Sequence, residues 1–189
     1  IQGTGIRQAV YMEVDVDPAQ QQAEVDHLSE ICKSGTAPTV AAVVSGRPAS
    51  ESFGKYIGQF KENRYIKGIR QVLHGGQTPA GYCLQPEFVR GIRQLGELGL
   101  SFDLCLRSAE LADGARLVDQ CSETRFIVDH CGNANVQAAD RSQWERDLAE
   151  LARRPNTICK VSGIVASAKP GEWKAEDLAP IVNHVLREF

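Results

Sequence analysis

Phe126-Ile127-Val128-Asp129-His130-Cys131-Gly132-Asn133 is an apolar run that ends in Asp-His and a glycine turn. Many α/β enzymes place a catalytic or metal-binding histidine in this way, at the carboxyl end of a buried strand where the backbone leaves the sheet. The segment predicts a buried strand over 125–130. It also makes His130 the first candidate for a functional residue.

Five further segments have the apolar character of strands, and helical patterns separate them. The six predicted strands alternate with helices along the whole chain, and no repeat or polar linker marks a second domain. We therefore predict one domain over residues 1–189. The predicted strands are 7–14, 39–44, 65–73, 100–106, 125–130 and 157–165.

The helix between the first two strands has clear signals at both ends. Asp17 and Pro18 suit its start, apolar residues follow at helical spacing, and Gly35 suits its end. Other helices are expected around residues 53–60, 88–95, 144–151 and 178–189. A weaker helix is expected over 110–120, interrupted by Gly114.

Six strand-helix units predict a mostly parallel sheet, either a doubly wound open sheet or part of a (β/α)8 barrel. A complete barrel needs about 250 residues and eight such units. The chain has 189 residues. The fold class expected is α/β, an incomplete (β/α)8 TIM-type barrel that lacks its first and last strands.

Composition describes an ordinary globular protein, with 42% hydrophobic and 24% charged residues. The formal net charge of -3 and scattered basic residues disfavour a nucleic-acid partner. No apolar stretch reaches the ~18 residues of a membrane span, and no leader opens the chain, so a cytoplasmic location is expected. Six cysteines occur without a C-x-x-C pair, and they are expected to be reduced and mostly buried.

Polar residues at the predicted strand ends are the candidates for the site, because active sites of parallel α/β folds lie there. Glu13 ends an apolar strand, where a carboxylate must be paired, solvated or coordinated. Arg70 and His74 are four residues apart, on one face if the strand persists. Arg70 suits a substrate carboxylate or a structural ion pair. His74 lies before two glycines and suits either the pocket or simple exposure.

Two further charged residues lie within apolar strands. Asp103 suits metal binding, orientation of a histidine or capping of a loop. Lys160 suits a negative partner, either a substrate carboxylate or a carboxylate such as Glu13 or Asp103. Cys131 and His130 are expected to point to opposite faces of a strand, which argues against a Cys-His nucleophile pair.

Four segments resemble, in order and spacing, the amidohydrolase-related proteins of the Amidohydro_2 type. They are YIKGIRQVL (65–73), LSFDLCL (100–106), FIVDHCG (126–132) and ICKVSG (158–163). The resemblance implies a metal-dependent or metal-derived hydrolase on a distorted (β/α)8 barrel. Such proteins begin with an H-x-H pair and end with a G-S-D-x-P segment. Neither motif occurs in this sequence, and both belong to the two strands expected to be absent.

The resemblance implies roles for three residues. His130 matches a histidine that serves as metal ligand or polarises a carbonyl group. Arg70 matches an arginine that contacts a substrate anion, and Lys160 matches a lysine that lines the active site. His74, Glu13 and Asp103 join the predicted substrate-binding set.

The function implied is hydrolysis of a sugar-acid or carboxylate-bearing lactone by activated water. Decarboxylation of an unsaturated carboxylic acid is the enzymatic alternative, and an inactive segment that binds a ligand or a subunit is the other. A divalent metal on His130, zinc first, is expected, with a metal-free site as the alternative. The expected partner is a small-molecule substrate, without nucleic acid or membrane; a homo-oligomer is left open.

Overall fold

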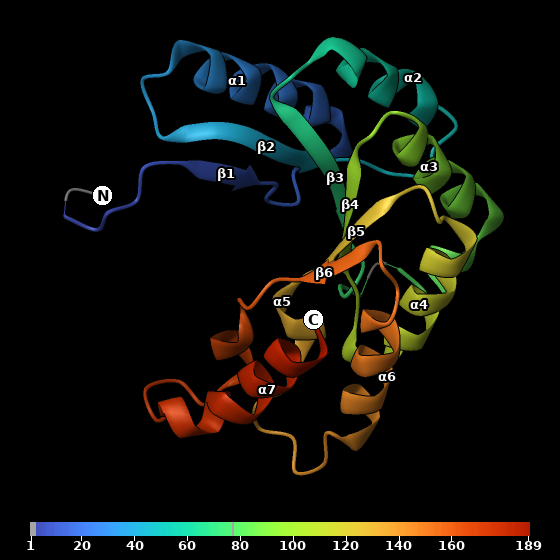
Figure 1. Cartoon of the computed structure of the whole chain (residues 1–189). Helices are drawn as coiled ribbons and strands as arrows, with labels where there is room; N and C mark the ends of the chain where they lie inside the picture. Colours follow the sequence, from blue (N-terminus) through green and yellow to red (C-terminus); the bar gives the residue numbers. More distant parts are fainter. Residues whose placement is uncertain (1–2, 77) are drawn as a thin grey trace.

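A computed structural model describes residues 3–76 and 78–189 of the chain. Its centre is a parallel sheet whose six described strands follow one another in sequence order, β1-β2-β3-β4-β5-β6. The sheet curls, as Figure 1 shows, so that the strands form part of a barrel wall. The strands are β1 (Ala9–Met12), β2 (Thr39–Ser45), β3 (Ile66–Val72), β4 (Ser101–Cys105), β5 (Arg125–Val128) and β6 (Thr157–Cys159).

The strand order decides between the two folds that the sequence left open. In a doubly wound sheet the order reverses at a switch point, and helices cover both faces. Here every strand pairs with the next one in the chain. Right-handed crossovers then place the connecting helices on one face, and Figure 1 shows them outside the curl. The predicted barrel-type fold with about six units is confirmed.

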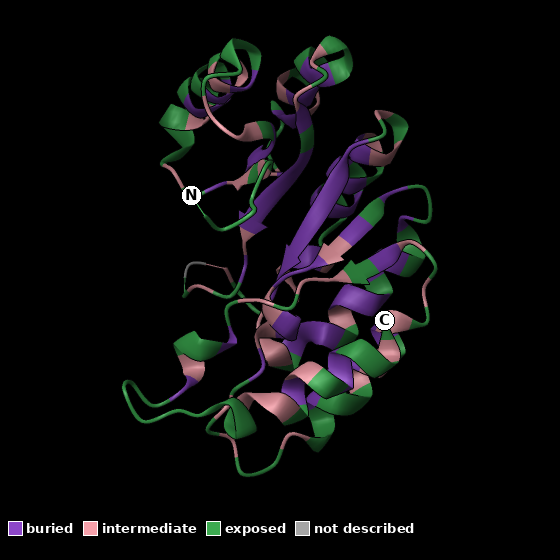
Figure 2. Cartoon of the chain, turned by 60° about the vertical axis from the view of Figure 1, so that its left-hand side comes forward, coloured by how far each residue is buried: buried purple, intermediate pink, exposed green. Residues whose placement is uncertain are grey.

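The helices cover the convex face of the sheet and bury its apolar side chains. Figure 2 shows buried strands and helices whose exposed sides face outward. The rings of Phe88, Phe102 and Phe126 meet edge to face, with centroids 5.6 Å and 6.5 Å apart. The helices are α1 (Gln21–Ser34), α2 (Phe53–Gly58), α3 (Pro86–Glu97), α4 (Leu111–Gln120), α5 (His130–Asn133), α6 (Ser142–Ala152) and α7 (Ala175–Glu188).

The signals at both ends of α1 act as predicted. The Asp17 side chain accepts a hydrogen bond from the backbone N–H of Ala19, and Pro18 opens a short 3-10 turn that leads into α1. Gly35 ends the helix with a φ of 63°, a left-handed conformation that glycine adopts without strain. Within the described residues, no helix is both long enough and apolar enough to cross a membrane.

The predicted interruption of the fourth helix is wrong. α4 runs without a break from Leu111 to Gln120 and buries Gly114. A Cβ atom at position 114 would lie 2.8 Å from Cδ1 of Leu106. The glycine therefore allows the helix to pack closely on the loop after β4. Close packing, rather than a helix end, accounts for a glycine at this position.

Several predicted strands extend beyond the strands observed. The segment predicted over 157–165 is a strand only to Cys159, and it then continues into a 3-10 turn at Ile164–Ser167. Likewise β5 ends at Val128, so His130 lies outside the strand. The expected strand geometry of the His130 and Cys131 pair is wrong, because both lie in a turn with positive φ. After both β5 and β6 the chain turns, and the side chains of the turn lie at the carboxyl edge of the sheet.

Gly91 offers a test of the packing between α3 and the loop after β2. A Cβ atom at position 91 would lie 2.2 Å from the backbone oxygen of Pro48. Because backbone cannot yield as a side chain does, Gly91→Ala is expected to lower the free energy of unfolding by about 1–3 kcal/mol. Gly58→Ala is the control, since a Cβ there meets nothing within 4 Å. Urea unfolding of both variants is the measurement, and equal midpoints would contradict the expectation.

Candidate functional site

The carboxyl ends of the strands hold a connected row of charged side chains. In order of contact they are Glu13, Arg70, Asp129, Lys160 and Asp103. Each comes from a different strand or from the residue directly after one. Positive and negative groups alternate along the row. Residues far apart in sequence thus form one ionic cluster at the edge where parallel barrels carry their sites.

Arg70 lies at the centre of this row and is 8% exposed. Its Nε donates to Oε1 of Glu13 at 2.6 Å, and its Nη2 donates to the Glu13 backbone oxygen at 2.6 Å. On the other side, Nη1 donates to Oδ2 of Asp129 at 2.9 Å. Despite burial, these carboxylates raise the pKa of Arg70. All three guanidinium nitrogens thus donate to protein groups. Of the two roles considered for Arg70, the structure shows the structural ion pair.

Lys160 is the more accessible of the two cations, with 32% of its side chain exposed. Its Nζ donates to Oδ1 of Asp129 at 2.8 Å and also to Oδ2 of Asp103. Burial disfavours its charge, but the hydrogen bonds to Asp103 and Asp129 raise its pKa. Lys160 therefore stays an ammonium group at neutral pH. It presents this charge to solvent at the site.

Asp103 is fully buried on β4, and burial raises the pKa of its carboxyl group to about 6. Its Oδ2 meets Lys160, whereas its Oδ1 has no hydrogen-bond partner among the described residues. The register places Asp103 beside Arg70 on β3. Asp103 faces the ionic cluster rather than a covering helix.

This pKa predicts how stability changes with pH. Folded Asp103 keeps its proton until about pH 6, from a usual value of 3.8. Between these values the folded state binds more protons, so the free energy of unfolding falls as pH rises through the window. We expect the free energy of unfolding of Asp103→Asn, relative to wild type, to rise by about 2 kcal/mol from pH 4 to pH 7. Urea titrations at both pH values check this. Parallel pH profiles would contradict it.

His130 leaves β5 in a turn of unusual backbone geometry. Four consecutive residues, His130–Asn133, have positive φ values between 52° and 65°. For residues other than glycine this conformation costs roughly 1–2 kcal/mol each, and such strain gathers at functional sites. The ring Nδ1 lies 2.9 Å from Oγ of Ser162. Burial is the main cause that lowers the pKa of His130, so the imidazole is neutral at pH 7.

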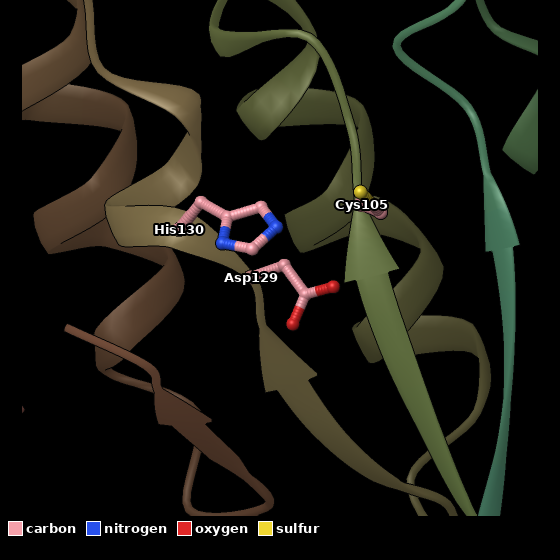
Figure 3. A group of neighbouring side chains, drawn as sticks. All are labelled: Cys105, Asp129 and His130. Atoms are coloured by element: carbon pink, nitrogen blue, oxygen red, sulfur yellow. The ribbon is translucent and has the colours of Figure 1, made fainter. Parts of the chain in front are cut away.

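Cys105, Asp129 and His130 form the group of possible metal ligands among the described residues, with ligand atoms within 4.8 Å of one another. Figure 3 shows the His130 ring and the Asp129 carboxylate at the end of β5, with Cys105 at the end of β4. Asp129 already binds a cation through each oxygen. Burial raises the pKa of Cys105 to about 12, so it is a thiol at neutral pH. The three residues do not fit a metal centre by themselves; only the free nitrogen of His130 suits a ligand.

The structure brings five of the six candidate residues into or beside one cluster. Ion pairs link four of these residues. Arg70 pairs with Glu13, Lys160 pairs with Asp103, and Asp129 joins the two cations. His130 adjoins them directly after Asp129. His74 lies exposed in the loop after β3, because that strand ends at Val72, yet its charge influences the pKa of His130.

Sequence reasoning missed Asp129 as a candidate, although it lies in the segment quoted first. Asp129 is fully buried and joins both cations of the cluster. A carboxylate directly after three apolar strand residues was the available signal. Ser162 was also missed, and its hydroxyl contact with His130 depends on a turn that no periodicity reveals.

The sequence profile of the amidohydrolase family matches residues 3–189. The chain belongs to the amidohydrolase family. It is 24% identical over 189 residues to the uncharacterised protein y4mH of Sinorhizobium fredii, covering 96% of this chain and 62% of that one. It is 24% identical over 125 residues to an L-fucono-1,5-lactonase of Burkholderia multivorans, covering 64% and 41% of the two chains.

Solved structures of amidohydrolases share the fold. A Burkholderia multivorans amidohydrolase with bound zinc superposes with a TM-score of 0.83 at 20% identity, covering 97% of this chain and 64% of that one. A 5-carboxyvanillate decarboxylase of Novosphingobium aromaticivorans with bound manganese gives a TM-score of 0.65 at 16% identity, covering 98% and 64%. The chain thus spans less than two thirds of the length of these amidohydrolases.

Proposed function

We propose that this amidohydrolase opens a lactone of a sugar acid, or a related carboxylate-bearing lactone, by attack of water. The observation that carries the proposal is a neutral His130 beside the partly exposed ammonium group of Lys160, at the carboxyl ends of the strands. The lactonase relative supports the substrate class. Water forms a bond to the carbonyl carbon, the ring C–O bond breaks, and the ring oxygen takes a proton to yield a hydroxy acid.

Lys160 suits the substrate's negative charge better than Arg70 does. Each guanidinium nitrogen of Arg70 already donates to Glu13 or Asp129, and the side chain is buried. The Lys160 ammonium group has three donors, and two of them reach Asp103 and Asp129. The remaining donor faces the Met12 sulfur at 3.9 Å, a weak acceptor that a carboxylate on the substrate or product would replace. Arg70 then acts through Asp129, whose position it fixes.

His130 is proposed to act on the carbonyl group of the lactone. Its Nδ1 is engaged by Ser162, which leaves Nε2 for the substrate. As a neutral ring with a proton on Nε2, it donates a hydrogen bond to the carbonyl oxygen as negative charge develops there. Such donors commonly contribute about 10²–10³-fold to the rate.

The predicted divalent metal remains a prediction. The zinc described above belongs to the Burkholderia protein, and a divalent ion in this site would supply a Lewis acid for the carbonyl and for water. His130 offers one ligand nitrogen, Nε2, which would have to give up its proton to bind an ion, and the remaining ligands would have to come from outside the cluster of Cys105 and Asp129. Metal analysis of the purified protein, with His130→Asn beside it, measures the content directly.

Decarboxylation of an unsaturated carboxylic acid is the second candidate, because the decarboxylase of Novosphingobium shares the fold. Lys160 would then hold a carboxylate that leaves as carbon dioxide. A binding segment without activity is the remaining alternative. Release of carbon dioxide without lactone turnover would favour the second candidate, and ligand binding without any turnover would favour the third.

The direct test is hydrolysis of L-fucono-1,5-lactone and a panel of neutral and carboxylate-bearing lactones, followed by acid release at constant pH. We expect turnover of at least one lactone. In Lys160→Met the KM for carboxylate-bearing lactones is expected to rise about tenfold or more, because a charged hydrogen bond is lost. Neutral lactones are expected to change less. Absence of lactone hydrolysis across the panel would overturn the proposal.

A further inference from the structure

The segment after β6 contacts both Asp129 and His130. The Lys160 ammonium group binds Asp129, and the Lys160 backbone oxygen accepts from the N–H of Cys131 at 3.0 Å. Two residues later, Ser162 meets His130. The segment Lys160–Gly163 therefore runs alongside the left-handed turn and contacts it at successive residues.

The contact with Ser162 determines which ring nitrogen of His130 faces the site. Oγ of Ser162 lies 2.9 Å from Nδ1. In Figure 3 the other ring nitrogen points to the side where Cys105 and Asp129 lie. No other hydrogen bond of this ring is present among the described residues. The Ser162 hydroxyl is thus the hydrogen-bond partner that orients the imidazole.

The backbone at Gly163 lies against the face of the His130 ring and limits rotation of the ring. A Cβ atom at position 163 would lie 2.5 Å from Nδ1 and 2.6 Å from Cγ of His130. Gly163 also has a φ of 70°, in the left-handed region. The backbone thus lies directly against the imidazole, which leaves little room for the ring to turn.

We infer that Ser162 is a positioning residue that donates its hydroxyl hydrogen to Nδ1 of His130 and thereby keeps the ring proton on Nε2. This inference rests on the proposed function for the part that His130 plays, but its structural content is independent of activity. A hydrogen bond to one ring nitrogen sets the tautomer of the other. Without Ser162 the ring exchanges its proton between the two nitrogens and loses its fixed direction.

The first test is the nitrogen NMR signature of His130 in protein labelled at histidine, at a pH where the ring is neutral. Wild type is expected to show an unprotonated Nδ1 and a protonated Nε2, assigned by their loss in His130→Asn. Ser162→Ala is expected to move the two signals toward an average. Ser162→Thr keeps the hydroxyl and restores the separation. Unchanged signals in Ser162→Ala would overturn the inference.

The second test is kinetic, with the lactone that the wild type hydrolyses. Ser162→Ala is expected to lower kcat about 10–100-fold, as loss of orienting partners commonly does, with KM within about twofold. Ser122→Ala is the matched control, because that exposed hydroxyl lies before β5, at the opposite end of the strand from His130, and contacts Glu123. A change in KM alone would contradict a positioning role. If Ser162→Ala does not fold, the ring signals of the wild type decide alone, and a proton on Nδ1 there overturns the inference.

The two tests separate the inference from the proposed function. If no lactone is hydrolysed but Ser162→Ala averages the ring signals, the inference holds and the proposed function fails. If the wild-type ring instead carries its proton on Nδ1, Ser162 does not donate and the inference is overturned, whatever the activity.

Discussion

Replacing His130 with Asn is expected to lower kcat for lactone hydrolysis by about 10²–10⁴-fold, the range typical of a group that acts on the reacting atoms. Asn retains polarity and a similar size near the ring position, but it lacks a nitrogen at the place of Nε2. KM is expected to change little, because the proposed contact with the substrate anion is made by Lys160 and not by His130. Steady-state kinetics of wild type and variant is the measurement.

His27→Asn is the control for this prediction. His27 lies exposed on α1, away from the ionic cluster at the strand ends. The same chemical change there is expected to leave both kcat and KM as in wild type. An unchanged kcat in His130→Asn, with the control also unchanged, would remove His130 from the reaction.

The second large effect concerns stability. Arg70→Met removes the cation between Glu13 and Asp129, which are 1% and 0% exposed. Two buried carboxylates then lose a partner, although Asp129 keeps Lys160. Breaking a buried pair by removing one member costs about 3–5 kcal/mol, because it leaves an uncompensated charge. We expect a loss of this size in the free energy of unfolding at pH 7, measured in urea.

Arg153→Met is the control, because that arginine pairs with Glu150 on the surface and its side chain is 75% exposed. Surface pairs contribute about 0–1 kcal/mol. Equal effects of the two substitutions would show that the buried row contributes little to stability.

Much of the fold follows from local sequence, and α1 shows why. Its start depends on Asp17 and Pro18, and its end depends on Gly35, each through the conformation or hydrogen bond of its own residue. The apolar strands were located for the same reason, since a run of apolar residues is a local property. Gly114 was misread because its role is a contact with Leu106 from another segment.

The candidate site was only partly predictable. Glu13, Arg70, Asp103 and Lys160 stood out because charge within an apolar strand is costly unless it is compensated. Their partners could not be assigned, since Arg70 and Asp129 are 59 residues apart in sequence and meet at 2.9 Å. Asp129 was missed because its cation partners, Arg70 and Lys160, lie 59 and 31 residues away in the sequence.

The sequence by itself determined the six strand-helix units, the family and the charged residues at the strand ends, because these depend on local pattern and motif. The tertiary structure decided which carboxylate pairs with which cation, that Arg70 is buried while Lys160 is partly exposed, and that Ser162 contacts His130. Those outcomes depend on strand register and on the path of turns such as His130–Asn133. These pairings and contacts depend on distances between residues that are far apart in the chain, and local sequence preferences do not determine such distances.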